Sequence, residues 1–133
     1  IFTPELMAGP SMIKGKVVLV PFPFDDLSAA KVRPAVCLTE PIGPYRQVVV
    51  AFLTRQIPND FAVTDLLLDH RHADFAATGL RVASVLRLHR LITLTTNVIQ
   101  RELGHLSPSL QAQVAERLMR LFGLGTLHGN TKS

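Results

Sequence analysis

The residues with the clearest chemical potential are an arginine and a threonine, each beside an expected strand. Arg33 stands where a polar loop meets the apolar run that begins at Pro34. Thr54 closes another apolar run, and Arg55 follows where the chain leaves the core. Polar groups at strand ends are held rigidly and still reach solvent, which is a common way to build a site. A guanidinium in this position could bind a phosphate through two parallel hydrogen bonds.

Other chemistry-bearing groups form weaker patterns. His70 and His72 could share one face of a strand as metal ligands, but no third ligand stands at a suitable spacing, so we predict neither a metal site nor a cofactor. Asp25 and Asp26 are adjacent in a polar loop, where carboxylates usually face water. The sequence has no glycine-rich phosphate loop, no nucleophile elbow and no HExxH pattern.

The composition is that of one well-packed globular domain. The chain has 133 residues, of which 47% are hydrophobic and 18% are charged, so wholesale disorder is excluded. The formal net charge is +4 and the sequence pI is about 9.8. This basic balance favours an anionic partner, of which nucleic acid is the commonest, although many ordinary enzymes carry a similar charge.

Cysteine usage and hydropathy favour a reducing cytoplasm. Cys37 is the single cysteine, which excludes an intrachain disulfide and a cysteine-rich zinc site, and we predict that it is a buried small hydrophobe. No apolar stretch is long enough to cross a bilayer, and residues 1–11 lack the features of a signal peptide. We expect a leader or vector-derived segment at 1–11, a single barrel domain at 12–125 and a flexible tail at 126–133.

Five short runs have the composition or the alternation of β-strands. In the last of them, Leu86 and Leu88 point to one face while Arg87 and His89 point to the other, which is the period of a half-buried strand. The third is almost entirely apolar, which predicts burial on both faces. The predicted strands are Val17–Pro23, Pro34–Thr39, Gln47–Thr54, Ala62–Leu68 and Ser84–Thr93.

Helical patterns follow in the last third of the chain. Asn97–Leu103 is predicted to form a short helix closed by Gly104. Ser107 at the N-cap and Pro108 at the first position begin a longer helix, which Gly123 ends. An apolar stripe at helical spacing would dock this helix on the sheet: Leu110, Val114, Leu118 and Leu121. The order of elements predicts a mainly β (α+β) fold, a small partly open barrel with one or two short helices and a C-terminal helix.

Four motifs in a fixed order give the chain a family likeness. The first contains KGKVVLVPFPF and KVRPAV, and the second is VVAFLTRQ. The motifs occupy residues 14–24, 26–28 and 31–36, then 49–56, then 79–80, 84–88 and 91–94, and finally 103–107. Over residues 12–122 the chain resembles the MazF/PemK-type toxins of type II toxin–antitoxin systems.

The resemblance implies an SH3-like β-barrel of the CcdB/MazF/PemK kind, a homodimer, and a cytoplasmic endoribonuclease that cuts single-stranded mRNA without a metal. By motif, Arg33 and Thr54 match the family's catalytic pair. RNA supplies its own nucleophile, the 2′-hydroxyl, so the protein has to align the backbone and stabilise charge on phosphorus. Arg33 would stabilise that charge and Thr54 would orient the phosphate, giving a 2′,3′-cyclic phosphate and a 5′-hydroxyl. The family also implies a cognate antitoxin that keeps the enzyme inactive.

Substrate contacts are expected from a polar loop and from outward-facing side chains of the fifth predicted strand. Splayed bases of single-stranded RNA require stacking faces and donors that read base edges. The candidate RNA-binding residues are Phe22, Phe24, Ser28, Lys31, Arg55, Arg87, His89 and Arg90. For the two phenylalanines a place in the core is an equally good interpretation.

Two other functions remain open from the sequence. A CcdB-like toxin shares the barrel but poisons DNA gyrase by binding, with no catalysis. A degenerate member of the family would act only as a module that binds RNA or antitoxin. Cleavage of synthetic RNA in the presence of EDTA separates the nuclease from both.

Overall fold

The computed structural model describes residues 13–21 and 31–124 of the chain. The expected leader at 1–11 and tail at 126–133 lie outside these residues. The described elements, in chain order, are β1 (Lys16–Pro21), β2 (Val32–Cys37), β3 (Gln47–Thr54), β4 (Asp65–Leu68), η1 (Ala76–Thr78), β5 (Ser84–Thr95), η2 (Thr96–Val98), β6 (Arg101–His105) and α1 (Pro108–Phe122). The η elements are single turns of 3-10 helix.

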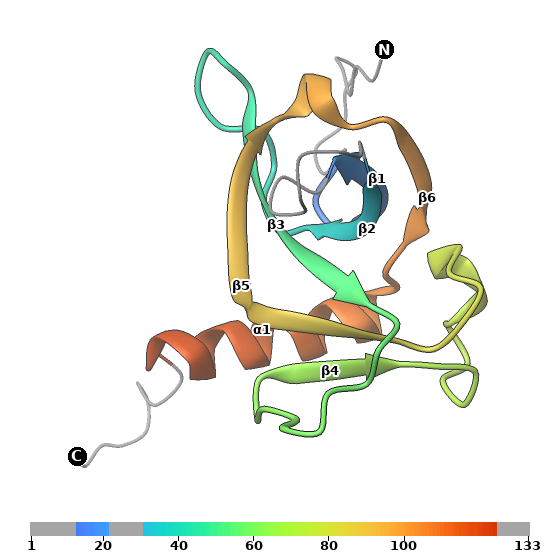
Figure 1. The fold of residues 1–133 in the computed structure, drawn as a ribbon. Coiled ribbons are helices and arrows are strands. Elements are labelled where there is room, and N and C mark those ends of the chain that lie inside the picture. The colour runs from blue at the N-terminus through green and yellow to red at the C-terminus, as the bar shows by residue number, and fades with distance from the viewer. Residues whose placement is uncertain (1–12, 22–30, 125–133) are drawn as a thin grey trace.

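The described strands form one antiparallel sheet in the order β4-β5-β3-β2-β1-β6. The sheet curls strongly, so that β5 and β6 arch around β1 and β2, and α1 lies across one end beside β4 (Figure 1). A curled sheet of this kind buries side chains on its inner face and on the face that the helix covers. The predicted mainly β fold with a C-terminal helix is confirmed.

Each face of the central strands carries its own buried cluster. One cluster joins Val17, Val36 and Leu53 to the apolar stripe of α1. The other joins Val18, Val20, Ala35, Cys37, Val48 and Val50 to Ile99. Because neighbouring residues along a strand point to opposite faces, β1, β2 and β3 contribute to both clusters. The prediction that Gln47–Thr54 is buried on both faces is therefore confirmed, with the same bounds.

The last helix follows the capping signals of the sequence. The Ser107 side chain accepts a hydrogen bond from the Leu110 backbone N–H at 3.2 Å, Pro108 occupies the first helical position, and Gly123 ends the helix in the left-handed conformation. Leu110 and Val114 are buried against the sheet, as the stripe predicts. Met119 and Phe122, near the end of the helix, stay exposed.

The predicted helix at Asn97–Leu103 is wrong. Thr96–Val98 forms one 3-10 turn, and Arg101–His105 then continues as the edge strand β6, which pairs with β1. The segment is too short to hold a helix by its own propensity, whereas pairing with β1 satisfies its backbone. Gly104 is part of that strand and does not close a helix.

The other strand predictions are correct in place and differ at their ends. The second strand begins at Val32 rather than Pro34, so Arg33 lies within β2 and not at its boundary. The fourth is shorter than predicted and starts at Asp65, and the fifth extends to Thr95. β1 ends at Pro21 in the described residues, and residues 22 and 23 of the predicted first strand lie outside them.

The buried thiol of Cys37 gives a first testable expectation. Its side chain is 1% exposed, and desolvation by burial, with a smaller contribution from Glu40, raises the thiol pKa from 9.0 to about 12. Since the thiolate is the reactive form, we expect the native thiol to react with a disulfide reagent at pH 8 at least ~100-fold more slowly than the thiol of the unfolded chain. Absorbance of the released reagent anion measures both rates.

The same shift has a consequence for stability at high pH. Below pH 9 the thiol is protonated in both the folded and the unfolded chain, so it favours neither state. Between pH 9 and about pH 12 only the unfolded chain ionises, and the free energy of unfolding therefore falls. Native reactivity equal to that of the unfolded chain would contradict the burial of Cys37.

Candidate functional site

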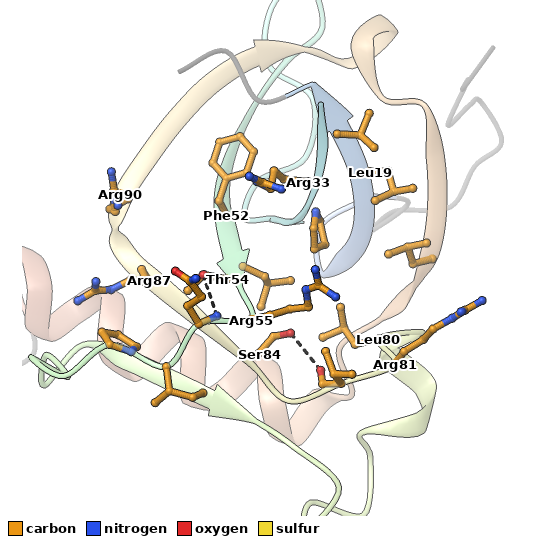
Figure 2. Close-up of a pocket in the computed structure, with 18 of the residues that line it drawn as sticks. Leu19, Arg33, Phe52, Thr54, Arg55, Leu80, Arg81, Ser84, Arg87 and Arg90 are labelled. Atoms are coloured by element: carbon orange, nitrogen blue, oxygen red, sulfur yellow. Dashed lines mark hydrogen bonds between the residues drawn. The ribbon is translucent and has the colours of Figure 1, made fainter. Parts of the chain in front are cut away.

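A wide cleft of about 1250 Å³ opens where β1 and β3 end and β2 begins. Its walls come from β2 and β3, the segment that follows β3, the segment 79–82, the bend of β5, and β6. Figure 2 shows side chains from these elements around the opening. The paired strands fix the position of the side chains that they contribute to the cleft.

The strand register brings Arg33 and Thr54 to one face of the sheet. The antiparallel ladder of β2 and β3 pairs Ala35 with Phe52. A step of two residues along a strand keeps the same face of the sheet. Two residues before Ala35 on β2 stands Arg33, and two residues after Phe52 on β3 stands Thr54. Both residues are half-buried and both line the cleft. In Figure 2 the Arg33 side chain lies next to the Phe52 ring, as diagonal neighbours on one face should.

Pro34 explains why the two strands part at this point. The Leu38 N–H donates to the Val49 carbonyl at 2.8 Å. In an antiparallel ladder every second residue donates to the same neighbour, so the backbone nitrogen of residue 34 also faces β3. Proline has no N–H to donate, so the pairing of β2 with β3 ends at Ala35. The strand ends therefore separate beside Arg33 and open the cleft.

The Thr54 hydroxyl is oriented by the turn that follows it. Its Oγ1 accepts a hydrogen bond from the Gln56 backbone N–H at 3.1 Å (dashed in Figure 2). A threonine hydroxyl has one proton to donate as well as lone pairs that accept. With the oxygen fixed by Gln56, the hydroxyl proton can be donated to an anionic oxygen in the cleft.

An irregularity in β5 presents a further group of cations. Ala51 pairs with Leu91, and Leu53 pairs with Leu86, so Phe52 alone stands opposite residues 87–90 of β5. Such a bulge bends the strand and re-aims its side chains. Here it directs Arg87, His89 and Arg90 to the cleft wall, while Leu88 stays buried.

Arginine dominates the charge of the cleft. Among the residues that the structure describes, the lining contains no aspartate or glutamate. Arg87 and Arg90 lie on one side of the view in Figure 2, Arg81 lies on the other, and Arg33 and Arg55 lie between them. Positive side chains around a concave surface raise the local concentration of anions. The lining arginines are Arg33, Arg55, Arg81, Arg87, Arg90 and Arg101.

The structure brings most of the sequence-predicted residues together. Arg33, Thr54, Arg55, Arg87, His89 and Arg90 all line the cleft. Lys31 is exposed immediately before β2 and is not part of the lining. Phe22, Phe24 and Ser28 lie outside the described residues.

Four residues of the site were not predicted from the sequence. Arg81 and Arg101 line the cleft from a loop and from the edge strand that was predicted as a helix. Phe52 was read only as part of an apolar strand. Asp65 is buried behind the cleft, where its carboxylate pairs with Arg87. None of them has a local sequence signal, because each joins the site through pairing between strands or between side chains distant in the sequence.

The two histidines that the sequence suggested as metal ligands have separate local contacts. The His70 ring packs against Phe75 with centroids 4.6 Å apart, and His72 Nδ1 accepts the Asp74 backbone N–H at 3.0 Å. Within residues 13–21 and 31–124, no three histidine, cysteine, aspartate or glutamate side chains gather as a metal site would require.

Comparison with family models identifies the chain. The model of the PemK-like, MazF-like toxins of type II toxin–antitoxin systems matches residues 13–122. The chain belongs to this toxin family. A comparison with the curated proteins gave no match. In the described residues, no helix is both long enough and apolar enough to span a membrane.

Solved structures of mycobacterial proteins share the fold of this PemK-like, MazF-like toxin. The Mycobacterium tuberculosis toxin MazF-mt6 aligns with a TM-score of 0.61 at 23% identity, over 82% of this chain and 97% of that one. An endoribonuclease from a mycobacterial species aligns with a TM-score of 0.60 at 18% identity, over 91% and 98%. A mycobacterial endoribonuclease in complex with its cognate antitoxin aligns with a TM-score of 0.59 at 17% identity, over 89% and 97%.

Proposed function

We propose that this toxin is a metal-independent endoribonuclease that cleaves single-stranded RNA in the arginine-lined cleft. The observation that carries the proposal is the placement of Arg33 and Thr54 on one face of two neighbouring strands, at a cleft whose described lining has six arginines and no carboxylate. Family membership and the fold shared with mycobacterial endoribonucleases support the same activity.

The chemistry requires only groups that align and stabilise the phosphate. The ribose 2′-oxygen attacks phosphorus, the bond from phosphorus to the 5′-oxygen breaks, and the products are a 2′,3′-cyclic phosphate and a 5′-hydroxyl. Arg33 stabilises the negative charge that builds on the phosphoryl oxygens, and Thr54 donates its hydroxyl proton to one of them. The leaving 5′-oxygen takes up one proton, and the 2′-hydroxyl gives one up. A guanidinium holds its protons at neutral pH, so charge stabilisation is the principal role of Arg33.

The deciding experiment is incubation of the purified protein with synthetic single-stranded RNA in EDTA. We expect cleavage with 2′,3′-cyclic phosphate ends, which mass spectrometry of the fragments identifies. Intact RNA together with inhibition of DNA gyrase supercoiling would instead establish a CcdB-like toxin. Intact RNA without gyrase inhibition would leave a binding module and would refute the nuclease.

Replacing Thr54 with valine tests the second member of the pair. Valine has nearly the same shape but lacks the hydroxyl, so it removes the donor to phosphate and the acceptor for Gln56 N–H. We expect the cleavage rate to fall by roughly 100-fold. Single-turnover rates on one RNA measure the effect. Thr54→Ser, which keeps the hydroxyl, is the matched control and should retain most of the activity.

The partners follow from the same proposal. We infer a cytoplasmic homodimer held inactive by a cognate antitoxin, in a single domain that spans residues 12–125. The antitoxin is supported by family membership and by the related complex of an endoribonuclease with its antitoxin. The dimer is supported by exposed apolar side chains on and after α1, at Met119, Phe122 and Leu124.

A further inference from the structure

Asp65 is the one buried acidic residue in the described part of the chain, and its carboxylate pairs with the cleft residue Arg87. Asp65 is the first residue of the short strand β4, and its side chain is 0% exposed. Its Oδ2 accepts the Ala62 backbone N–H at 2.8 Å, and its Oδ1 lies 3.9 Å from His89 Nδ1. A buried carboxylate persists only when charges and hydrogen bonds compensate it. The charged part of this compensation comes from the Arg87 guanidinium, which contacts both carboxylate oxygens.

Arg87 meets this carboxylate through one edge of its guanidinium. Its Nε donates to Oδ1 of Asp65 at 3.2 Å, and its Nη2 lies 3.1 Å from Oδ2. The two residues stand directly opposite each other in the ladder of β4 and β5, so the backbone register enforces the contact. The Arg87 side chain is 16% exposed, and this residue lines the cleft.

The pairing leaves part of the guanidinium for a second anion. A guanidinium has five N–H donors in a planar fork, and the edge that faces Asp65 uses Nε and Nη2. Nη1 has no hydrogen-bonding partner among the residues that the structure describes. Asp60 lies 3.8 Å from Nη2, beyond hydrogen-bond reach, and its side chain is 87% exposed, so water screens it.

The β4–β5 pair is itself tied to the C-terminal helix. Nε of Arg117 on α1 donates to the Asp65 backbone carbonyl at 3.1 Å, and its Nη1 donates to the Gln113 carbonyl at 3.3 Å. Asp65 is therefore fixed from its backbone and from its side chain. Because the Asp65 side chain is already ordered, it loses no further conformational entropy when it binds the Arg87 guanidinium.

We propose that Asp65 is a positioning residue for RNA binding: it holds the Arg87 guanidinium so that its outer edge faces the cleft and contacts a phosphate of the bound strand. The role rests on the proposed function, because it requires RNA in the cleft. An arginine that is already ordered loses less side-chain entropy on binding than a freely rotating one. The carboxylate thus increases affinity although its own charge repels phosphate.

The test is a double-mutant cycle on RNA affinity. We measure binding of a 2′-O-methyl RNA, which lacks the attacking hydroxyl, by fluorescence anisotropy at several salt concentrations. Arg87→Ala should weaken binding about tenfold at 0.1 M salt. The slope of log affinity against log salt concentration should become less negative by about 0.7, the value for one phosphate contact on a single strand. Asp65→Asn should reproduce both changes, and the double variant should bind no more weakly than Arg87→Ala.

A second aspartate–arginine fork provides the matched control. Nε and Nη2 of Arg71 contact Asp69 at 3.2 and 2.9 Å, and neither residue lines the cleft. Asp69→Asn makes the same chemical change and should leave RNA affinity and its salt dependence unaltered. Circular dichroism confirms that each variant is folded at the temperature of the binding assay.

The possible outcomes separate the positioning role from a merely structural one. The positioning role is overturned if Asp65→Asn keeps the wild-type affinity and salt dependence, or if it binds RNA more tightly. It is also overturned if the losses of affinity in Asp65→Asn and Arg87→Ala add in the double variant. If the wild-type chain neither binds nor cleaves RNA, the proposed function fails and the role of Asp65 fails with it. Wild-type cleavage with an unaffected Asp65→Asn variant refutes the role of Asp65 alone.

Discussion

Replacing Arg33 with alanine should reduce RNA cleavage by roughly a thousandfold or more while the protein stays folded. The guanidinium lies on the same face of the sheet as the Thr54 hydroxyl and lines the same cleft, and stabilisation of developing charge is commonly the largest single contribution to such a reaction. The Arg33 side chain is only half-buried in the described structure, and it is absent from both apolar clusters. Single-turnover cleavage of one synthetic RNA measures the rate, and urea unfolding measures the stability.

Two further variants make this result specific. Arg71→Ala removes an arginine outside the cleft whose side chain is 83% exposed, and it should cleave at the wild-type rate. Arg33→Lys keeps the charge but loses the planar fork, and we expect an intermediate rate because an ammonium cannot bind two phosphate oxygens in the same geometry. Full activity in Arg33→Ala would remove Arg33 from the catalytic site.

Replacing Gly79 with alanine should cause a large loss of stability. Gly79 has φ +76°, and a Cβ there would lie 2.1 Å from the Leu103 carbonyl oxygen. The left-handed conformation costs about 1–2 kcal/mol for alanine, and the clash with backbone adds about 1–3 kcal/mol because β6 has to shift. Urea unfolding followed by circular dichroism gives the difference in the free energy of unfolding.

Gly43 offers a closely matched control for that substitution. It has φ +73°, and nothing lies within 4 Å of the position its Cβ would take. Gly43→Ala should therefore lower the free energy of unfolding only by the cost of the left-handed conformation. If the two variants lost equal stability, the close approach of Gly79 to the Leu103 carbonyl on β6 would be wrong.

The contact that Gly79 makes is also a condition for the cleft. Gly104 on β6 faces the same turn from the other side, where a Cβ would lie 2.2 Å from the Ala77 carbonyl oxygen. Two glycines thus let a turn and an edge strand touch through their backbones. Leu80 and Arg81 follow at once and line the cleft, so this contact sets one of its walls.

The family and the candidate pair Arg33 and Thr54 could be predicted from local motifs, whereas the set of side chains that lines the cleft could not. Arg33 and Thr54 carry motif signals, and the alternation in β5 correctly separates buried Leu86 and Leu88 from the cations beside them. Arg81 and Arg101 reach the cleft only because the sheet curls, and Asp65 matters only because it pairs across to Arg87. Charge along the chain does not reveal which cations will share one surface.

Elements whose signals are local could be predicted from the amino-acid sequence. The capped helix from Pro108, the apolar strand Gln47–Thr54 and the burial of Cys37 all follow from residue type and spacing, because propensity, capping and period act over a few residues. Arg101–His105 is a strand because of long-range pairing: its partner β1 lies more than eighty positions earlier and supplies the hydrogen bonds that a short isolated helix cannot keep. The pairing of β2 with β3, which runs as far as Ala35 and Phe52, likewise put Arg33 and Thr54 on one face at the cleft.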